Sequence, residues 1–333
     1  MTVTQSVLGD FADTDAGALL PCTSTQTGMV FETITRSPAV YLEQIVVRLR
    51  EQVDARCMQE AWVRLAARHD AMRLSFEIGQ ATSLRQRVAP TVRVPFVERD
   101  WRRLEPFEQE KRWRDLLRAD RQGGFALESA PLFRVTLCQI ADADFRMLFT
   151  HHHAIIDGYA GVTVQLELFA IYDSLRAGAE INLPEPDSFQ SFVEWASLQG
   201  ADENGLDFWR RALAGIEEPT PAPIGDDDDD GEGSAGVAEI RLGTELSARL
   251  GDFCARCEMS LATVLQGAFA VLLSQEVAQD DLLYATTRAG RRSPPMDTHR
   301  MVGVLMVASP VRLRMSRELS FQDLLAQIRD LSL

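Results

Sequence analysis

The sequence predicts a mixed α/β fold, because segments with the two-residue period of strands alternate with segments of helical period. Residues 41–49 and 145–150 read as strands, and residues 55–69 and 162–175 read as helices. Of the 333 residues, 46% are hydrophobic and 25% are charged, which is ordinary for a globular chain. This length predicts about two domains with enough residues to bury a core.

The predicted helices carry start signals as well as periodicity. In the segment 55–69, Trp62 and Leu65 lie on one apolar side. A polar-faced helix is predicted over 105–121, and Pro106 stands at its start, where a missing amide donor costs no hydrogen bond.

The elements predicted for the second half are a strand over 238–242, a buried helix over 260–273 capped by Ser260, and a last helix over 321–331. Ser320 and Asp323 form the capping signal of the last helix. Residues 219–236 contain five consecutive aspartates followed by three glycines, which predicts a solvated linker or surface loop.

Three consecutive histidines, His151, His152 and His153, end the strand before the 162–175 helix, and Asp157 and Gly158 follow them. Because side chains alternate along a strand, the first and third histidines share one face and the second lies on the other. This order would aim the third imidazole into a cleft and bring the amides of the helix start near developing negative charge. An imidazole can accept a proton near neutral pH. The pattern is typical of an acyl-transfer site.

The spacing of His152, His153, Asp157 and Gly158 resembles the HHxxxDG signature of nonribosomal peptide synthetase condensation domains, which have the chloramphenicol-acetyltransferase-like fold. Five further segments resemble other motifs of this family in the same order along the sequence: residues 20–31, 68–76, 130–134, 281–291 and 302–310. The ordered matches make coincidence improbable.

The resemblance implies an α+β sandwich with two lobes that face each other across a tunnel. We expect an N-terminal segment over 1–17, an acyltransferase-like lobe over 18–180 and a C-terminal lobe over 181–333 that includes the acidic loop. The boundary is expected in the neighbourhood of residues 178–188. Condensation domains continue through more strands than this sequence contains, so the second lobe is expected to be incomplete, with a truncation at the C-terminal end.

The resemblance also implies roles for the motif residues. His153 would face the tunnel and accept a proton, position the amine or stabilise the charged intermediate. Gly158 would let a pantetheine arm or the acyl carbonyl approach the backbone closely. His152 is expected to be structural, and Asp157 is expected to pair with Arg291 as an architectural anion.

The candidates for lining the substrate are His151, Tyr159, Val307 and Ser309. The family has Asn-Thr where this sequence has Val307 and Ala308. This change removes a polar group near the expected tunnel, which bears on how the acceptor is handled. Direct acyl transfer needs no covalent nucleophile, no bound cofactor and no metal, because the substrates are carried on the phosphopantetheine arms of carrier proteins.

Three functions remain open at this point. The first is amide formation, less often ester formation, between an acyl or peptidyl thioester on one carrier protein and an aminoacyl thioester on another. The second is a free-standing acyltransferase that uses a soluble thioester such as acyl-coenzyme A. The third is a non-catalytic carrier-binding fragment. Donor and acceptor carrier proteins and adjacent synthetase domains are the expected partners.

Charge and cysteine content exclude other classes. The formal net charge is -15, from 34 basic and 49 acidic residues, and no basic stripe with aromatics is present, so nucleic acid and anionic membranes are poor partners. A basic docking face around Arg288, Arg291 and Arg292 is a further expectation. No signal peptide or membrane-spanning run is visible, which predicts a cytoplasmic protein. Cys254 and Cys257 fit two small helix residues better than a metal or redox site.

Overall fold

A computed structural model of the protein describes residues 19–79, 84–199, 203–221, 239–292, 295–316 and 318–331. It separates into two compact units. The first comprises the residues up to Asp202 together with Arg288–Val307, and the second comprises Glu203–Thr287 and Ala308–Leu333. The lobe boundary expected near 178–188 falls inside the first unit, so the assignment of lobes stays a prediction.

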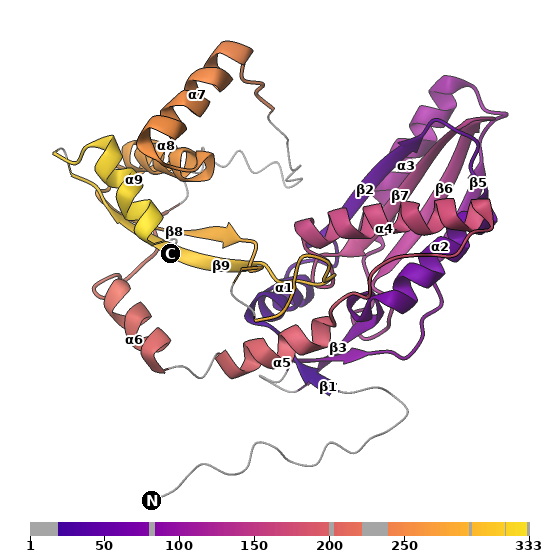
Figure 1. The fold of residues 1–333 in the computed structure, drawn as a ribbon, viewed down its shortest axis with the longest axis horizontal. Helices are drawn as coiled ribbons and strands as arrows, with labels where there is room; N and C mark the ends of the chain where they lie inside the picture. The colour runs from indigo at the N-terminus through magenta and orange to yellow at the C-terminus, as the bar shows by residue number, and fades with distance from the viewer. Residues whose placement is uncertain are drawn as a thin grey trace, which may run out of the picture. The chain divides into compact units, whose positions relative to one another are not determined.

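The first unit contains two sheets and five α-helices within the described residues (Figure 1). Its strands are β1 (Leu19–Pro21), β2 (Leu42–Leu49), β3 (Leu74–Ile78), β4 (Leu84–Val88), β5 (Phe96–Asp100), β6 (Phe133–Ala141) and β7 (Asp144–His152). Its helices are α1 (Ser24–Thr35), α2 (Ala55–Arg68), α3 (Pro106–Gln122), α4 (Gly158–Ala177) and α5 (Phe189–Gln199). The larger sheet has the order β2-β7-β6-β5 and the smaller β1-β4-β3. Only the β5–β6 pair is parallel among the described strand pairs of these two sheets.

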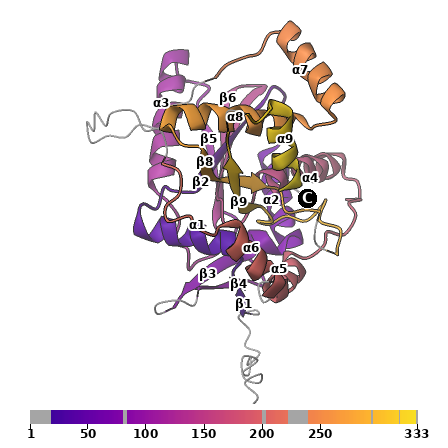
Figure 2. The same cartoon turned by 90° about the vertical axis from the view of Figure 1, so that its left-hand side faces the viewer.

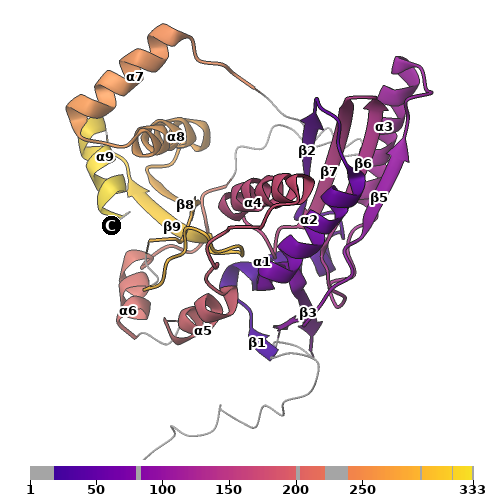
Figure 3. The same ribbon diagram turned by 45° about the vertical axis from the view of Figure 1, so that its right-hand side comes forward.

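Helices cover both faces of the larger sheet (Figure 3). On one face, Trp62 of α2 packs on the rings of Phe149 and Phe133, with centroids 4.6 Å and 5.9 Å away. On the other face, Trp113 of α3 belongs to a separate buried cluster with Leu148. The alternation of Leu148 and Phe149 along β7 therefore serves two cores, one on each side.

The turn after β7 is fixed by the cap of α4. The side chain of Asp157 accepts a hydrogen bond from the amide of Ala160, so it is the N-cap residue and the helix begins at Gly158. The helix predicted over 162–175 therefore starts four residues earlier than its apolar spacing indicated. This extension places the start of α4 directly after the histidines.

The second unit has its own core. Its elements are α6 (Glu203–Ala212), α7 (Thr244–Cys257), α8 (Leu261–Val277), β8 (Asp281–Arg288), β9 (Val307–Arg314) and α9 (Phe321–Asp330). β8 and β9 pair, and α8 and α9 lie over this pair (Figure 2). Gly267 lets α8 approach α9 closely, because a Cβ there would lie 2.6 Å from Leu325. Ser260 and Ser320 cap α8 and α9 as predicted.

One predicted element of the second half is wrong. The strand expected over 238–242 is irregular over residues 239–242, and the side chain of Ile240 is 87% exposed. Alternating apolar residues do not make a strand without a neighbouring strand to pair with. Most of the predicted acidic loop over 219–236, and the segment 1–17, lie outside the described residues.

Among the described residues, no single helix is long and apolar enough to cross a membrane. Helices α7 and α8 meet the length and composition criteria only as a pair, and the backbone bends by 101° between them.

Candidate active site

His152 is fully buried and has both ring nitrogens engaged. Its Nδ1 accepts a hydrogen bond from the amide of Ala154 at 3.1 Å, so Nε2 carries the proton and donates to Thr33 Oγ1 at 3.0 Å. Burial, with a smaller contribution from neighbouring His153, lowers the pKa of His152 to about 4. His152 is therefore a neutral side chain that ties β7 to α1.

His151 lies on the opposite side of the strand end. Its ring stacks on Phe149, with centroids 4.9 Å apart and planes at 17°. Burial above all, and then the adjacent His153 and His152, lowers the pKa of His151 to about 3. Within the described residues neither of its ring nitrogens has a hydrogen bond, and Nε2 lies 3.8 Å from a carboxylate oxygen of Glu43. His151 is 1% exposed, and its contact with a substrate stays a prediction.

His153 is the most exposed histidine of the motif. Its Nδ1 lies 2.9 Å from the carbonyl oxygen of Ile156, which can only accept, so Nδ1 carries a proton and donates. In the neutral form of the ring Nε2 then has the lone pair, and it points toward Glu43, whose Oε1 is 3.3 Å away. The backbone of His153 is held by Tyr41, whose carbonyl accepts its amide at 2.7 Å and whose ring meets the imidazole edge-on. The turn thus fixes the tautomer that leaves Nε2 available.

Asp157 has the most hydrogen bonds of the motif residues in the described structure. Its Oδ1 accepts from Ala160 and from Nη2 of Arg291 at 2.9 Å, and its Oδ2 accepts from the amides of Leu305 and Met306. The carboxylate is 2% exposed. It therefore joins the start of α4 to residues 303–306, far along the sequence, and has no oxygen left for a reaction.

Arg291 is buried and forms the expected ion pair with Asp157. Its Nη1 donates to the carbonyl oxygens of Thr298 and Met301. The guanidinium also lies over the ring of Tyr159, 4.3 Å from the centroid. A docking face that includes Arg291 is therefore wrong, because a buried, paired arginine is not presented to a partner.

The segment that carries Arg291 depends on the glycine before it. Gly290 has φ +66°, and a Cβ there would lie 1.8 Å from the carbonyl oxygen of Leu305. Only glycine permits both this conformation and this approach. Gly290 thus lets Arg291 reach Asp157.

Gly158 is exposed and adopts ordinary helical geometry. A Cβ added there would meet nothing within 4 Å, so neither packing nor backbone strain requires a glycine at this position. In the described part of the structure, Asp157 occupies the amides of Ala160 and Gly161, whereas no hydrogen bond is seen from the amides of Gly158 and Tyr159. The start of α4 therefore offers open space and two backbone amides without a hydrogen bond in the described structure. They lie beside the turn that follows the three histidines, called the histidine turn below.

The other lining candidates lie in different places. Tyr159 is 45% exposed, and its hydroxyl lies 3.3 Å from Nδ1 of His299. The Tyr159 ring borders a surface pocket of about 400 Å³ with Val162 and Leu166 of α4. Val307 is the first residue of β9, whereas Ser309 is half-buried in the same strand and belongs to the second unit. Their contacts with a substrate stay predictions.

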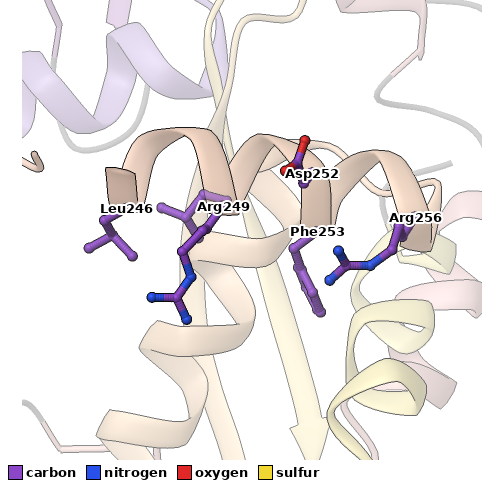
Figure 4. A pocket seen from close by; sticks show the side chains of 6 residues that line it. Leu246, Arg249, Asp252, Phe253 and Arg256 are labelled. Carbon is purple, nitrogen blue, oxygen red and sulfur yellow. The ribbon is translucent and has the colours of Figure 1, made fainter. Parts of the chain in front are cut away.

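A second hollow, of about 290 Å³, lies along α7 (Figure 4). Leu246, Arg249, Phe253 and Arg256 line it, and all belong to one helix face of the second unit. It contains none of the motif residues. The cysteines of α7 are half-buried free thiols, and within the described residues no three His, Cys, Asp or Glu side chains gather to bind a metal.

Glu43 is the site residue that sequence reasoning missed. The register of β2 and β7 places it directly opposite His151, and its carboxylate faces two imidazoles. A charged residue within the apolar strand 41–49 was the available signal. Its partner could not be read from the sequence, because the pairing joins residues far apart in sequence.

Together these residues define an acyltransferase-like α/β domain with one available imidazole nitrogen at a strand-to-helix turn. The sequence profile of the condensation domain family matches residues 18–333. The protein therefore belongs to the condensation domain family, as the motifs predicted. Its fold is the chloramphenicol-acetyltransferase-like α/β fold of that family, with open sheets.

Similar sequences occur in large synthases. One of the linear gramicidin synthase proteins of Brevibacillus parabrevis is 28% identical over 323 residues, and bacitracin synthase 1 of Bacillus licheniformis is 27% identical over 309 residues. The matches cover 95% and 92% of the present sequence but 4% and 6% of those synthases.

Solved structures share the fold. The first condensation domain of the calcium-dependent antibiotic synthetase has a TM-score of 0.75 at 17% identity, and the match spans 95% of the present protein and 74% of that domain structure. SgcC5 of Streptomyces globisporus has a TM-score of 0.73 at 21% identity, with 94% and 72% matched.

Proposed function

We propose that this protein forms an amide bond between an acyl or peptidyl thioester donor and an aminoacyl acceptor, both held on carrier proteins through phosphopantetheine arms. Its family and its synthase relatives support this function. The single observation that carries it is the hydrogen bond between Nδ1 of His153 and the carbonyl oxygen of Ile156. In the neutral ring this bond leaves the lone pair on Nε2.

Different residues serve different parts of the proposed reaction. Nε2 of His153 accepts the proton that the amine must lose, or holds the amine in line by a hydrogen bond. The first-turn amides of α4 at Gly158 and Tyr159 can stabilise negative charge on the tetrahedral oxygen. Gly158 leaves room for the thioester to reach these amides, and Asp157 and Arg291 hold the turn in place.

The test is a transfer assay with two carriers. A panel of acyl donors on one carrier protein is incubated with a panel of aminoacyl acceptors on a second, and the acceptor is followed by intact mass. We expect an acyl-sized mass gain with wild type and none above the uncatalysed rate with His153→Ala. Circular dichroism and a thermal melt establish that the variant is folded. An equal mass gain in both proteins would contradict the proposal.

A second candidate is a free-standing acyltransferase that takes a soluble thioester. One structural neighbour supports it, the starter condensation domain of rhizomide synthetase, whose structure was solved with C8-CoA and Leu-SNAC; its TM-score is 0.73 at 20% identity. Equal rates with acyl-coenzyme A and with the acyl carrier as donor would favour this candidate.

A further inference from the structure

The Glu43 carboxylate lies between two imidazoles at the end of the β2–β7 pair. One oxygen is 3.3 Å from Nε2 of His153, and the other is 3.8 Å from Nε2 of His151. The Glu43 side chain is 43% exposed, so it can be reached from solvent and can move. It is therefore a charged group placed directly beside the nitrogen that the reaction uses.

In the part of the chain that the structure describes, no cationic side chain pairs with the Glu43 carboxylate. Among the described residues its ion-pair partners are the two histidines, and no arginine or lysine pairs with it. The more buried carboxylates of the same unit differ, because Asp157, Asp120 and Glu167 each pair with an arginine. Glu43 is left with an anionic charge that an incoming cation can satisfy.

His151 gives the carboxylate a second point of contact. A neutral imidazole always carries one N–H, and burial keeps His151 neutral. Its buried nitrogens have no hydrogen bond in the described structure, and Nε2 lies 3.8 Å from a carboxylate oxygen of Glu43. A small movement of the carboxylate would close this contact and orient the other oxygen toward His153.

Nε2 of His153 and Oε1 of Glu43 define one binding position. Because Nδ1 is occupied by Ile156, an acceptor amine can reach the imidazole only at Nε2, and it then meets the carboxylate as well. An α-amino group with a pKa of about 8 is largely an ammonium ion at neutral pH. An ammonium has three donors, which can serve both groups at once.

We propose that Glu43 binds the ammonium form of the acceptor and thereby selects an amine over an alcohol as the acceptor class. This inference rests on the proposed function, because it assigns the acceptor of that same site. Glu43 is then a binding residue for the substrate, and His151 is a positioning residue that acts through it.

The ammonium gives one proton to Nε2 of His153, and the free amine forms the C–N bond with the thioester carbonyl carbon. The nitrogen then gives a second proton to solvent water while the C–S bond breaks, and the leaving thiolate takes the proton from His153. Glu43 stays ionised throughout and holds the acceptor nitrogen in place. One ammonium and one thioester thus give one amide, one thiol and one proton.

The test compares charged and neutral acceptors on the protein of residues 1–333. Aminoacyl N-acetylcysteamine thioesters that wild type accepts are paired with the α-hydroxyacyl thioesters of the same side chain. For Glu43→Gln we expect KM for the aminoacyl acceptor to rise about tenfold or more, because a charge-assisted hydrogen bond is lost, and kcat to change by less than about threefold. KM for the hydroxyacyl acceptor should stay within about twofold of the wild-type value.

Two further variants separate charge from shape. Glu43→Asp keeps the charge, and we expect it to recover part of the lost affinity for the amine. Glu51→Gln removes an exposed carboxylate just after the same strand, and both acceptors should behave as with wild type.

An unchanged KM for the amine, or an equal loss with both acceptors, would overturn the role of Glu43. If wild type forms no amide with any acceptor, the proposed function itself fails instead.

Discussion

The two sides of the histidine turn differ in how completely their charges are paired. Around Asp157 the buried carboxylate has four hydrogen-bond donors, among them Arg291. Around Glu43 a half-exposed carboxylate meets only two histidine rings, one of them without any hydrogen bond in the described structure. The fully paired Asp157 carboxylate can only stabilise the fold, whereas the incompletely paired Glu43 carboxylate can still bind a ligand.

The largest expected effect on stability comes from removing either partner of the ion pair between Asp157 and Arg291. Asp157→Ala and Arg291→Ala each leave a buried charge or its donors unpaired, which costs about 3–5 kcal/mol of folding free energy. We expect both variants to lose soluble protein, measured as yield and as melting temperature. Normal yield with loss of turnover only would contradict the structural role.

Removing the imidazole of His153 should leave the fold intact. His153 is partly exposed and contributes one side-chain hydrogen bond, to Ile156. A proton acceptor typically contributes a factor of about 10² to 10⁴ to the rate. We expect His153→Ala to lose turnover by such a factor with a melting temperature close to that of wild type.

Acid should weaken the fold through the two buried histidines. The pKa values of His151 and His152 are lowered to about 3 and about 4, so the unfolded state binds more protons than the folded one below pH 6.5. Stability should therefore fall as pH falls from 6.5 toward 4, by about 1 kcal/mol per pH unit for each histidine.

Urea unfolding at pH 7, 6 and 5 measures this slope. The variant His152→Gln should show a shallower slope than wild type, because one of the two titrating groups is gone. An unchanged slope would mean that His152 does not contribute to the acid sensitivity.

The smallest effect is expected at the start of α4. Gly158→Ala adds a methyl group in open space, so the melting temperature should not fall. If the thioester approaches this backbone, turnover should still fall by about tenfold, since a misplaced substrate loses alignment. Gly251→Ala, on exposed helix α7 and equally free of contacts, is the matched control.

Much of this arrangement could be predicted from sequence. Strand alternation placed His151 and His153 on one side and His152 on the other, and the motif resemblance paired Asp157 with Arg291. Local signals suffice for the strand alternation, because it is set within a few residues, whereas the pair of Asp157 and Arg291, 134 residues apart, came from the family resemblance.

Distant contacts that the family motifs do not include could not be predicted. Glu43 meets the histidines only because β2 and β7 pair in one register. The segment 238–242 has the alternation of a strand but no partner in the described structure, and Ile240 stays exposed. The burial of Arg291 likewise depends on the path of residues 298–306, which no local pattern encodes.

Turnover per folded molecule, measured in Asp157→Asn and in His153→Ala, separates the structural role of Asp157 from the chemical role of His153. Folded protein is quantified from the melt, and amide product from the mass of the acceptor carrier. We expect Asp157→Asn to have a lower melting temperature but near wild-type turnover per folded molecule, and His153→Ala to have a near wild-type melting temperature but little turnover. Full turnover in folded His153→Ala would show that Nε2 of His153 does not take part in the reaction.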